Sequence, residues 1–236
     1  MKELSALEIK KELEKQGILN KEKYGVMQFT FLDLKVTKVN VDAVGYVFQN
    51  WLSKWFVKND IFFEEPKNSQ ESPDFFLKKK DKKSGLLEVK TFYKSPSFDI
   101  QGWDAFLNLM IEKPYHIFSD YLIFHYYVDL ENNNFGIKDL FLKKIWEISR
   151  PMGTRAKIPF KINVQYKNNT IVNIRPSGLK DLNETKSSHF KDHKEFLNAV
   201  QETIDMYSKS NNKLKNGKWL NIVKKNYSKI TKKELF

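Results

Sequence analysis

The stretch of sequence that decides the fold is PDFFLKKKDKKSGLLEVKTF, residues 73–92. It contains two short apolar segments, PDFFL and LLEVKTF, separated by the polar and Gly-containing loop KKKDKKSG. This pattern predicts an antiparallel β-hairpin. In a β-strand alternate side chains share a face, so Glu88 and Lys90 are expected to point the same way while Val89 points into the core.

The polar groups of this hairpin suit metal-assisted hydrolysis of a phosphodiester. Strand pairing is expected to bring Asp74 close to Glu88, which places two carboxylates and the Lys90 ammonium at one rim of a sheet. Mg²⁺ binds one or two carboxylates together with waters and substrate phosphate, and the Val89 carbonyl offers a further oxygen. We therefore expect Asp74 and Glu88 to hold the metal. Lys90 is expected to orient the attacking water, to stabilise the phosphate or to assist deprotonation.

Each of these residues also has a purely structural interpretation. Pro73-Asp74 is a common turn opener, and Glu88 with Lys90 can be a pair of charges on an exposed strand face. Asp42 can supply an accessory acid from the preceding helix, or it can act as the N-cap of that helix. Other residues compete for the accessory role, namely Gln49, Glu64, Glu65 and Glu71.

The charge of the chain points to a polyanionic partner. Lys and Arg number 41 against 29 Asp and Glu, which gives a formal net charge of +12. Such a surplus favours nucleic acid first and an anionic membrane surface second. A generally Lys-rich composition is the alternative explanation, since the chain has three arginines among its many lysines.

Several classes of protein are excluded by what the sequence lacks. The absence of cysteine excludes disulfides, Cys-ligated zinc and thiol nucleophiles. The N-terminal residues 1–16 carry charges throughout and show no signal-peptide pattern, and no stretch of 18 apolar residues predicts a membrane span. A phosphate-binding GxxxxGK[ST] loop is also missing, so no nucleotide cofactor is expected. We expect a cytoplasmic protein.

The order of the remaining elements predicts an α/β fold with a mixed central sheet flanked by helices. We interpret the chain as one domain over residues 1–236, with a core at about 42–176 and a basic helical part at about 185–236. The expected helices span 2–16, 42–58, 99–112, 189–208 and 214–230, a strand end precedes a helix in 135–149, and strands or hairpins are expected over 25–36, 120–130 and 158–176.

Two segments carry apolar residues at positions that predict burial. In the segment 25–36 an irregular alternation gives the candidate positions Val26, Phe29, Phe31, Leu34 and Val36. In the predicted helix 42–58 the apolar residues form a broad stripe, made of Val44, Val47, Phe48, Trp51, Leu52, Trp55 and Phe56.

The motif and its surroundings resemble a known family. Pro73-Asp74, thirteen intervening residues and Glu88-Val89-Lys90 resemble the signature of the PD-(D/E)XK nuclease superfamily. The flanking text resembles the NgoBV/NlaIV family of Type II restriction endonucleases from about Asp42 to about Pro176, in DAVGYVFQNWLSKWF, SQESPDFFL, GLLEVKTF, SFDIQGWDAF, KPYHIFSDYLIFHY and NIRP.

This resemblance implies a restriction-endonuclease-like core and a specific activity. It implies Mg²⁺-dependent hydrolysis of double-stranded DNA that leaves 5′-phosphate and 3′-hydroxyl ends, with Mn²⁺ as a substitute metal and GGNNCC as the associated site. A palindromic site calls for a two-fold protein, so a homodimer is expected. The alternatives are a repair or junction-resolving nuclease of the same superfamily, and a DNA-binding protein without catalysis.

Candidate DNA contacts lie after the expected core strands. Arg150, Arg155 and Lys157 fall in the loop RPMGTRAKIP, and an arginine can bind guanine O6 and N7 with two hydrogen bonds. Phosphate contact or simple solvation is the alternative for these residues. The basic stretch from Lys209 to Lys233 can clamp the DNA backbone, or it can be the charged face of a docked helix.

Overall fold

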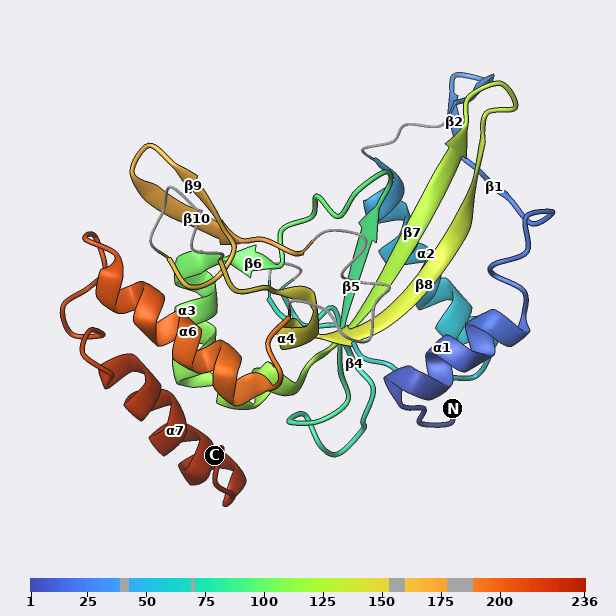
Figure 1. Ribbon diagram of the computed structural model, residues 1–236. Helices are drawn as coiled ribbons and strands as arrows, with labels where there is room; N and C mark the ends of the chain where they lie inside the picture. Colours follow the sequence, from blue (N-terminus) through green and yellow to red (C-terminus); the bar gives the residue numbers. More distant parts are fainter. Residues whose placement is uncertain (39–42, 69–70, 153–159, 178–188) are drawn as a thin grey trace. The chain divides into compact units, whose positions relative to one another are not determined.

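A computed structural model describes residues 1–38, 43–68, 71–152, 160–177 and 189–236 (Figure 1). The chain forms two compact units, one from Met1–Pro96 with Asp120–Lys143 and one from Ser97–Ser119 with Lys144–Phe236. The single endonuclease domain expected from the sequence stays a prediction. Within the described ranges, no helix combines the length and the apolar character that crossing a membrane requires.

The first unit is built on a mixed five-stranded sheet. Its strands lie in the order β1-β8-β7-β5-β4. β5 runs parallel to β7 and antiparallel to β4, and β1 runs antiparallel to β8, so the expected mixed α/β fold is confirmed. The bounds are β1 Gly25–Val26, β4 Phe75–Phe76, β5 Leu86–Phe92, β7 Asp120–Asp129 and β8 Asn134–Lys144.

One face of this sheet is covered by helices. Helix α2 (Val44–Lys58) places Phe48 against Phe124 of β7, with ring centroids 5.0 Å apart. Helix α1 (Ala6–Lys15) begins at a capping box between Ser5 and Glu8 and adds its apolar side to the same core. Since Val89 belongs to this core, the side chains that alternate with it along β5 lie on the opposite face of the sheet.

The segment after β1 forms a separate hairpin, which corrects one expectation. β2 (Gln28–Phe31) pairs with β3 (Leu34–Thr37), and residues 32 and 33 both have positive φ in the turn, as a tight two-residue hairpin turn requires. The apolar positions expected to be buried are exposed: Val26, Phe29, Phe31, Leu34 and Val36. Alternation identified a shared apolar face, but this hairpin is a two-stranded sheet apart from the central one.

A second correction concerns helix α2. Most of its expected apolar face is buried, but Trp51 is 39% exposed and Val47 is half-buried. Both residues line a pocket beside the helix rather than the sheet core, because they lie at the edge of the stripe.

The second unit contains a small sheet with helices packed together. Helices α3 and α7 meet through Phe106 and Trp219, and the Trp219 indole donates to the Leu107 carbonyl at 3.2 Å. Helix α7 is docked by its apolar face, as one of the two interpretations of the basic stretch expected. The bounds are β6 Gln101–Gly102, α3 Trp103–Glu112, η2 Pro114–Phe118, α4 Ile145–Ile148, β9 Val164–Lys167, β10 Thr170–Ile174, α6 His193–Met206 and α7 Lys218–Thr231, with sheet order β6-β10-β9.

Candidate active site

The pairing of β4 with β5 brings together the residues of the motif. Phe75 lies opposite Leu87, and the same register places Asp74 opposite Glu88. The Val89 backbone N–H donates to Oδ2 of Asp74 at 2.7 Å. The expected juxtaposition of the two acidic residues is therefore present, because a short polar loop closes the hairpin directly between them.

Helix α2 supplies a second anchor for Asp74. Nε2 of Gln49 donates to Oδ1 of Asp74 at 3.1 Å, so each carboxylate oxygen accepts one hydrogen bond. Because a carboxylate oxygen has further acceptor capacity, both oxygens can still bind another group. Gln49 is one of several residues that compete for an accessory role in the sequence, and in the structure its amide holds the Asp74 carboxylate.

Glu88 is buried and held on two sides. Only 7% of the residue is exposed. The Ser72 hydroxyl donates to Oε1 of Glu88, and the Lys90 ammonium lies 3.9 Å from Oε2. Glu88 and Lys90 thus share one face of β5, two residues apart, as expected.

Burial dominates the electrostatics of the two carboxyl groups. Burial, aided by the charge of Asp74, raises the pKa of Glu88 to about 7, against the lowering effects of Lys90 and the Ser72 hydroxyl. Burial also raises the pKa of Asp74, against the lowering effects of the Val89 N–H and Lys90. Two charged carboxylates are therefore costly side by side, and a bound cation relieves that cost.

Tyr121 lies beside the cluster on the neighbouring strand β7. It lies opposite Glu88 in the parallel pair of β5 and β7 and is buried. Burial, followed by the charges of Glu88 and Asp74, raises the pKa of Tyr121 well above its ordinary value, so its phenol stays neutral. Sequence reasoning missed Tyr121 and Ser72. The position of Ser72 just before Pro73-Asp74 was a usable signal, whereas Tyr121 depends on pairing between distant segments.

The donor set fits a hard divalent cation. Asp74 and Glu88 provide two carboxylates, and Mg²⁺ commonly takes one or two together with water and phosphate. Among the described residues, no group of three or more His, Cys, Asp or Glu side chains forms a metal cluster. The candidate site is therefore suited to an ion that keeps part of its hydration shell.

Three of the remaining candidates from the sequence fall outside the described ranges, and a fourth belongs to the second unit. Asp42, Arg155 and Lys157 lie outside the described residues. Arg150 is exposed just after α4 in the second unit, and its backbone carbonyl accepts from the Asn163 N–H at 3.2 Å. The roles of these residues in DNA contact or metal binding stay predictions.

A mixed sheet that carries two carboxylates and a lysine on a strand pair is the arrangement of a restriction-endonuclease-like enzyme. The family model of the NgoBV restriction endonuclease matches residues 3–236. The chain belongs to this family, and it is a site-specific deoxyribonuclease.

Two curated relatives and one solved structure agree with this assignment. The Type II restriction enzyme NlaIV of Neisseria lactamica is 39% identical over 196 residues, which cover 82% of this chain and 77% of the relative. The Type II restriction enzyme NgoBV of Neisseria gonorrhoeae is 37% identical over 145 residues, covering 60% of this chain and 80% of the relative. A solved NlaIV restriction endonuclease matches with a TM-score of 0.87 at 34% identity, over 100% of this chain and 93% of that one.

Proposed function

We propose that this enzyme hydrolyses double-stranded DNA with Mg²⁺ held by Asp74, Glu88 and the Val89 carbonyl. The observation that supports this proposal is the position of Asp74 beside β5. The Val89 N–H holds one oxygen of the Asp74 carboxylate next to the Glu88–Lys90 pair. Mn²⁺ has the same preference for oxygen ligands and is expected to substitute. The products are 5′-phosphate and 3′-hydroxyl ends, and the expected place of action is the cytoplasm.

Each residue of the cluster has its own role in the proposed hydrolysis. Bound Mg²⁺ supplies charge neutralisation at the phosphate and a more acidic water. Asp74 is oriented by Gln49 and Val89, and Glu88 is oriented by Ser72, so both carboxylates present fixed oxygens. The Lys90 ammonium is a donor for a phosphate oxygen or for the attacking water.

We further propose that the recognised site is GGNNCC and that the enzyme acts as a homodimer. The family resemblance supports the sequence of the site. A palindrome presents two equivalent strands, and a two-fold dimer presents one active site to each. Arg150, Arg155 and Lys157 are the proposed contacts to guanine or phosphate, because arginine matches the guanine edge with two hydrogen bonds.

Digestion of a plasmid of known sequence tests this function. The wild-type protein with Mg²⁺ is expected to give discrete fragments whose ends map to GGNNCC, and EDTA is expected to stop cleavage. Random nicking, cleavage only at branched DNA, or inactivity with both Mg²⁺ and Mn²⁺ contradicts the proposal.

A lysine pair provides the matched test of the site. Lys90→Ala is expected to reduce the cleavage rate by at least about 100-fold, a typical loss when one charge-stabilising donor is removed, while DNA binding persists. Lys80→Ala removes the same charge from the exposed loop between β4 and β5 and is expected to cut at the wild-type rate. Full activity of Lys90→Ala removes Lys90 from the mechanism.

A further inference from the structure

The β2–β3 hairpin presents an apolar face to solvent. In its register Phe29 pairs with Val36 and Phe31 with Leu34, so these four side chains share one face, here called the hairpin face. Both phenylalanines are more than 60% exposed and Leu34 is 73% exposed. An isolated two-stranded sheet is only marginally stable, and a contiguous exposed apolar patch marks an interaction surface.

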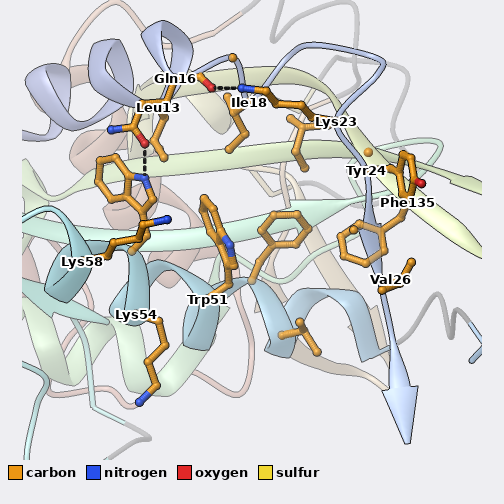
Figure 2. Close-up of a pocket in the computed structure, with 17 residues that line it drawn as sticks. Leu13, Gln16, Ile18, Lys23, Tyr24, Val26, Trp51, Lys54, Lys58 and Phe135 are labelled. Atoms are coloured by element: carbon orange, nitrogen blue, oxygen red, sulfur yellow. Dashed lines mark hydrogen bonds between the residues drawn. The ribbon is translucent and has the colours of Figure 1, made fainter. Parts of the chain in front are cut away.

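The same unit contains a pocket of about 510 Å³ that is lined largely by apolar side chains (Figure 2). Helix α2 supplies Phe48, Trp51 and Trp55 to its wall, and β8 supplies Phe135. No residue of the β2–β3 hairpin lines this pocket, called here the α2 pocket. The hairpin face and the α2 pocket are therefore both apolar and both unfilled by the described part of their own chain.

The α2 pocket has a basic rim, whereas the turn at the tip of the hairpin is acidic. Lys23, Lys54 and Lys58 line the α2 pocket, and none of its described lining residues is acidic. Lys54 and Lys58 are exposed, and neither forms an ion pair with a carboxylate in the described ranges. The turn of the hairpin carries Asp33, which is also exposed. Lys35 of the hairpin pairs with Thr30 and so lies on the face opposite the hairpin face.

The chemistry of the hairpin face favours a protein partner over DNA. Contact with a DNA backbone needs cations, whereas the hairpin face is apolar, its turn carries the acidic Asp33, and Lys35 lies on the opposite face of the hairpin. The exposed apolar side chains amount to roughly 500 Å², and a stable interface buries about 800 Å² on each partner. In a two-fold dimer each copy contributes both surfaces, so the hairpin face and the α2 pocket together supply an area of that size.

We propose that the hairpin face of one copy docks in the α2 pocket of a second copy, and reciprocally. Phe29 and Phe31 then pack on Trp51, and Asp33 meets Lys54 or Lys58 at the rim. This inference rests on the homodimer of the proposed function and assigns the residues that build it.

Sedimentation equilibrium of the full chain in EDTA, without DNA, measures the dimer directly. The arm variant, Phe29→Ser with Phe31→Ser, and the pocket variant, Trp51→Ala, are each expected to raise the dimer dissociation constant by about 30-fold or more. The control variant, Thr30→Ser with Thr37→Ser on the polar face of the hairpin, is expected to dimerise like the wild type. Lys58→Glu is a second pocket variant and is also expected to weaken the dimer. Because Lys58 is exposed at the rim, a weaker dimer of this variant does not come from misfolding.

Mixing the arm and pocket variants tests the reciprocal geometry. The dimer has two equivalent contacts, each between a hairpin face and an α2 pocket. In a homodimer of either variant, both of these contacts carry a substitution and are lost. In the mixed dimer one intact hairpin face meets one intact α2 pocket, so an equimolar mixture is expected to dimerise at least about 10-fold more tightly than either variant. A dimer formed by two hairpin faces gives a different result, because the pocket variant then dimerises like the wild type.

Three results overturn the inference. They are a monomeric wild type at tens of micromolar, an arm or pocket variant that dimerises as tightly as the wild type, and a mixture that regains nothing. An arm variant that keeps its dimer but loses DNA affinity assigns the hairpin face to DNA instead. Plasmid digestion by the wild type tests the proposed cleavage separately. A monomer that cuts at GGNNCC removes the homodimer and its docking surfaces but leaves the proposed cleavage activity, while an inactive dimer removes only that activity.

Discussion

Replacing Glu88 by glutamine in the metal-free protein is expected to stabilise it, and by an amount that depends on pH. In the folded protein the pKa of Glu88 is raised from 4.5 to about 7, chiefly by burial. Because the folded pKa lies above the unfolded one, ionisation opposes folding. The stability associated with protonated Glu88 is complete below pH 4.5 and is lost as the pH rises through about 7.

The magnitude follows from the interval between the two pKa values. One pKa unit corresponds to about 1.4 kcal/mol, so the full penalty above the folded pKa is about 3 kcal/mol. Glutamine stays neutral at every pH, has nearly the same shape and keeps an oxygen that accepts from the Ser72 hydroxyl. Glu88→Gln is therefore expected to exceed the wild type by about 3 kcal/mol near pH 8.5 and by about 1 kcal/mol near pH 5.5.

Urea denaturation followed by tryptophan fluorescence, in EDTA from about pH 5.5 to about pH 8.5, measures this difference. Trp51 and Trp55 report on the unit that holds the site. Glu131→Gln, an exposed change in the turn between β7 and β8, is the control and is expected to leave stability unchanged at both ends of the range. A pH-independent difference between Glu88→Gln and the wild type, or a Glu88→Gln protein that is less stable at pH 8.5, refutes the reasoning.

Three further changes test the surroundings of the site and the second unit. Gln49→Ala removes a donor to Asp74 and is expected to weaken Mg²⁺ binding by about 10-fold in calorimetry, without changing the fold. Ser72→Ala removes a hydrogen bond that lowers the pKa of Glu88, so the pH at which Mg²⁺ binding reaches half its maximum is expected to rise; a midpoint that stays or falls contradicts this. Trp219→Ala opens a cavity in the second unit and is expected to lower its unfolding free energy by about 3–5 kcal/mol, with a loss under about 1 kcal/mol speaking against the packing described.

The hairpin that carries the candidate site could be predicted because the sequence signals that define it are local. Two apolar segments flank a polar loop that carries Gly85, which has a φ of +62° that glycine tolerates. Once the strands pair, alternation alone places Glu88 and Lys90 on one face. The contacts of Gln49 and Tyr121 with this site depend instead on how α2 and β7 pack on β5, and no short-range pattern encodes that packing.

The exposure of the β2–β3 hairpin, by contrast, could not be predicted from the sequence. Alternation correctly identifies which side chains share a face, since Phe29 and Phe31 do lie together. It does not say whether the rest of the chain covers that face, because coverage depends on the sheet that the segment joins. The same ambiguity applies to Trp51, which lies at the edge of an apolar helical stripe and lines a pocket instead of the core.

In the proposed metal site, the burial that raises the pKa of Glu88 also makes metal binding depend on pH. With a pKa of about 7, Glu88 in the metal-free protein is only partly ionised at neutral pH, so the repulsion from Asp74 is limited. Metal binding requires the charged carboxylate and therefore releases a proton. Lys90 offsets part of the negative charge but lies 3.9 Å from Glu88, close enough to attract it and too far for a hydrogen bond. Mg²⁺ bound as proposed would stabilise the charged form of Glu88, and its binding would then be coupled to the stability of the hairpin that carries the site.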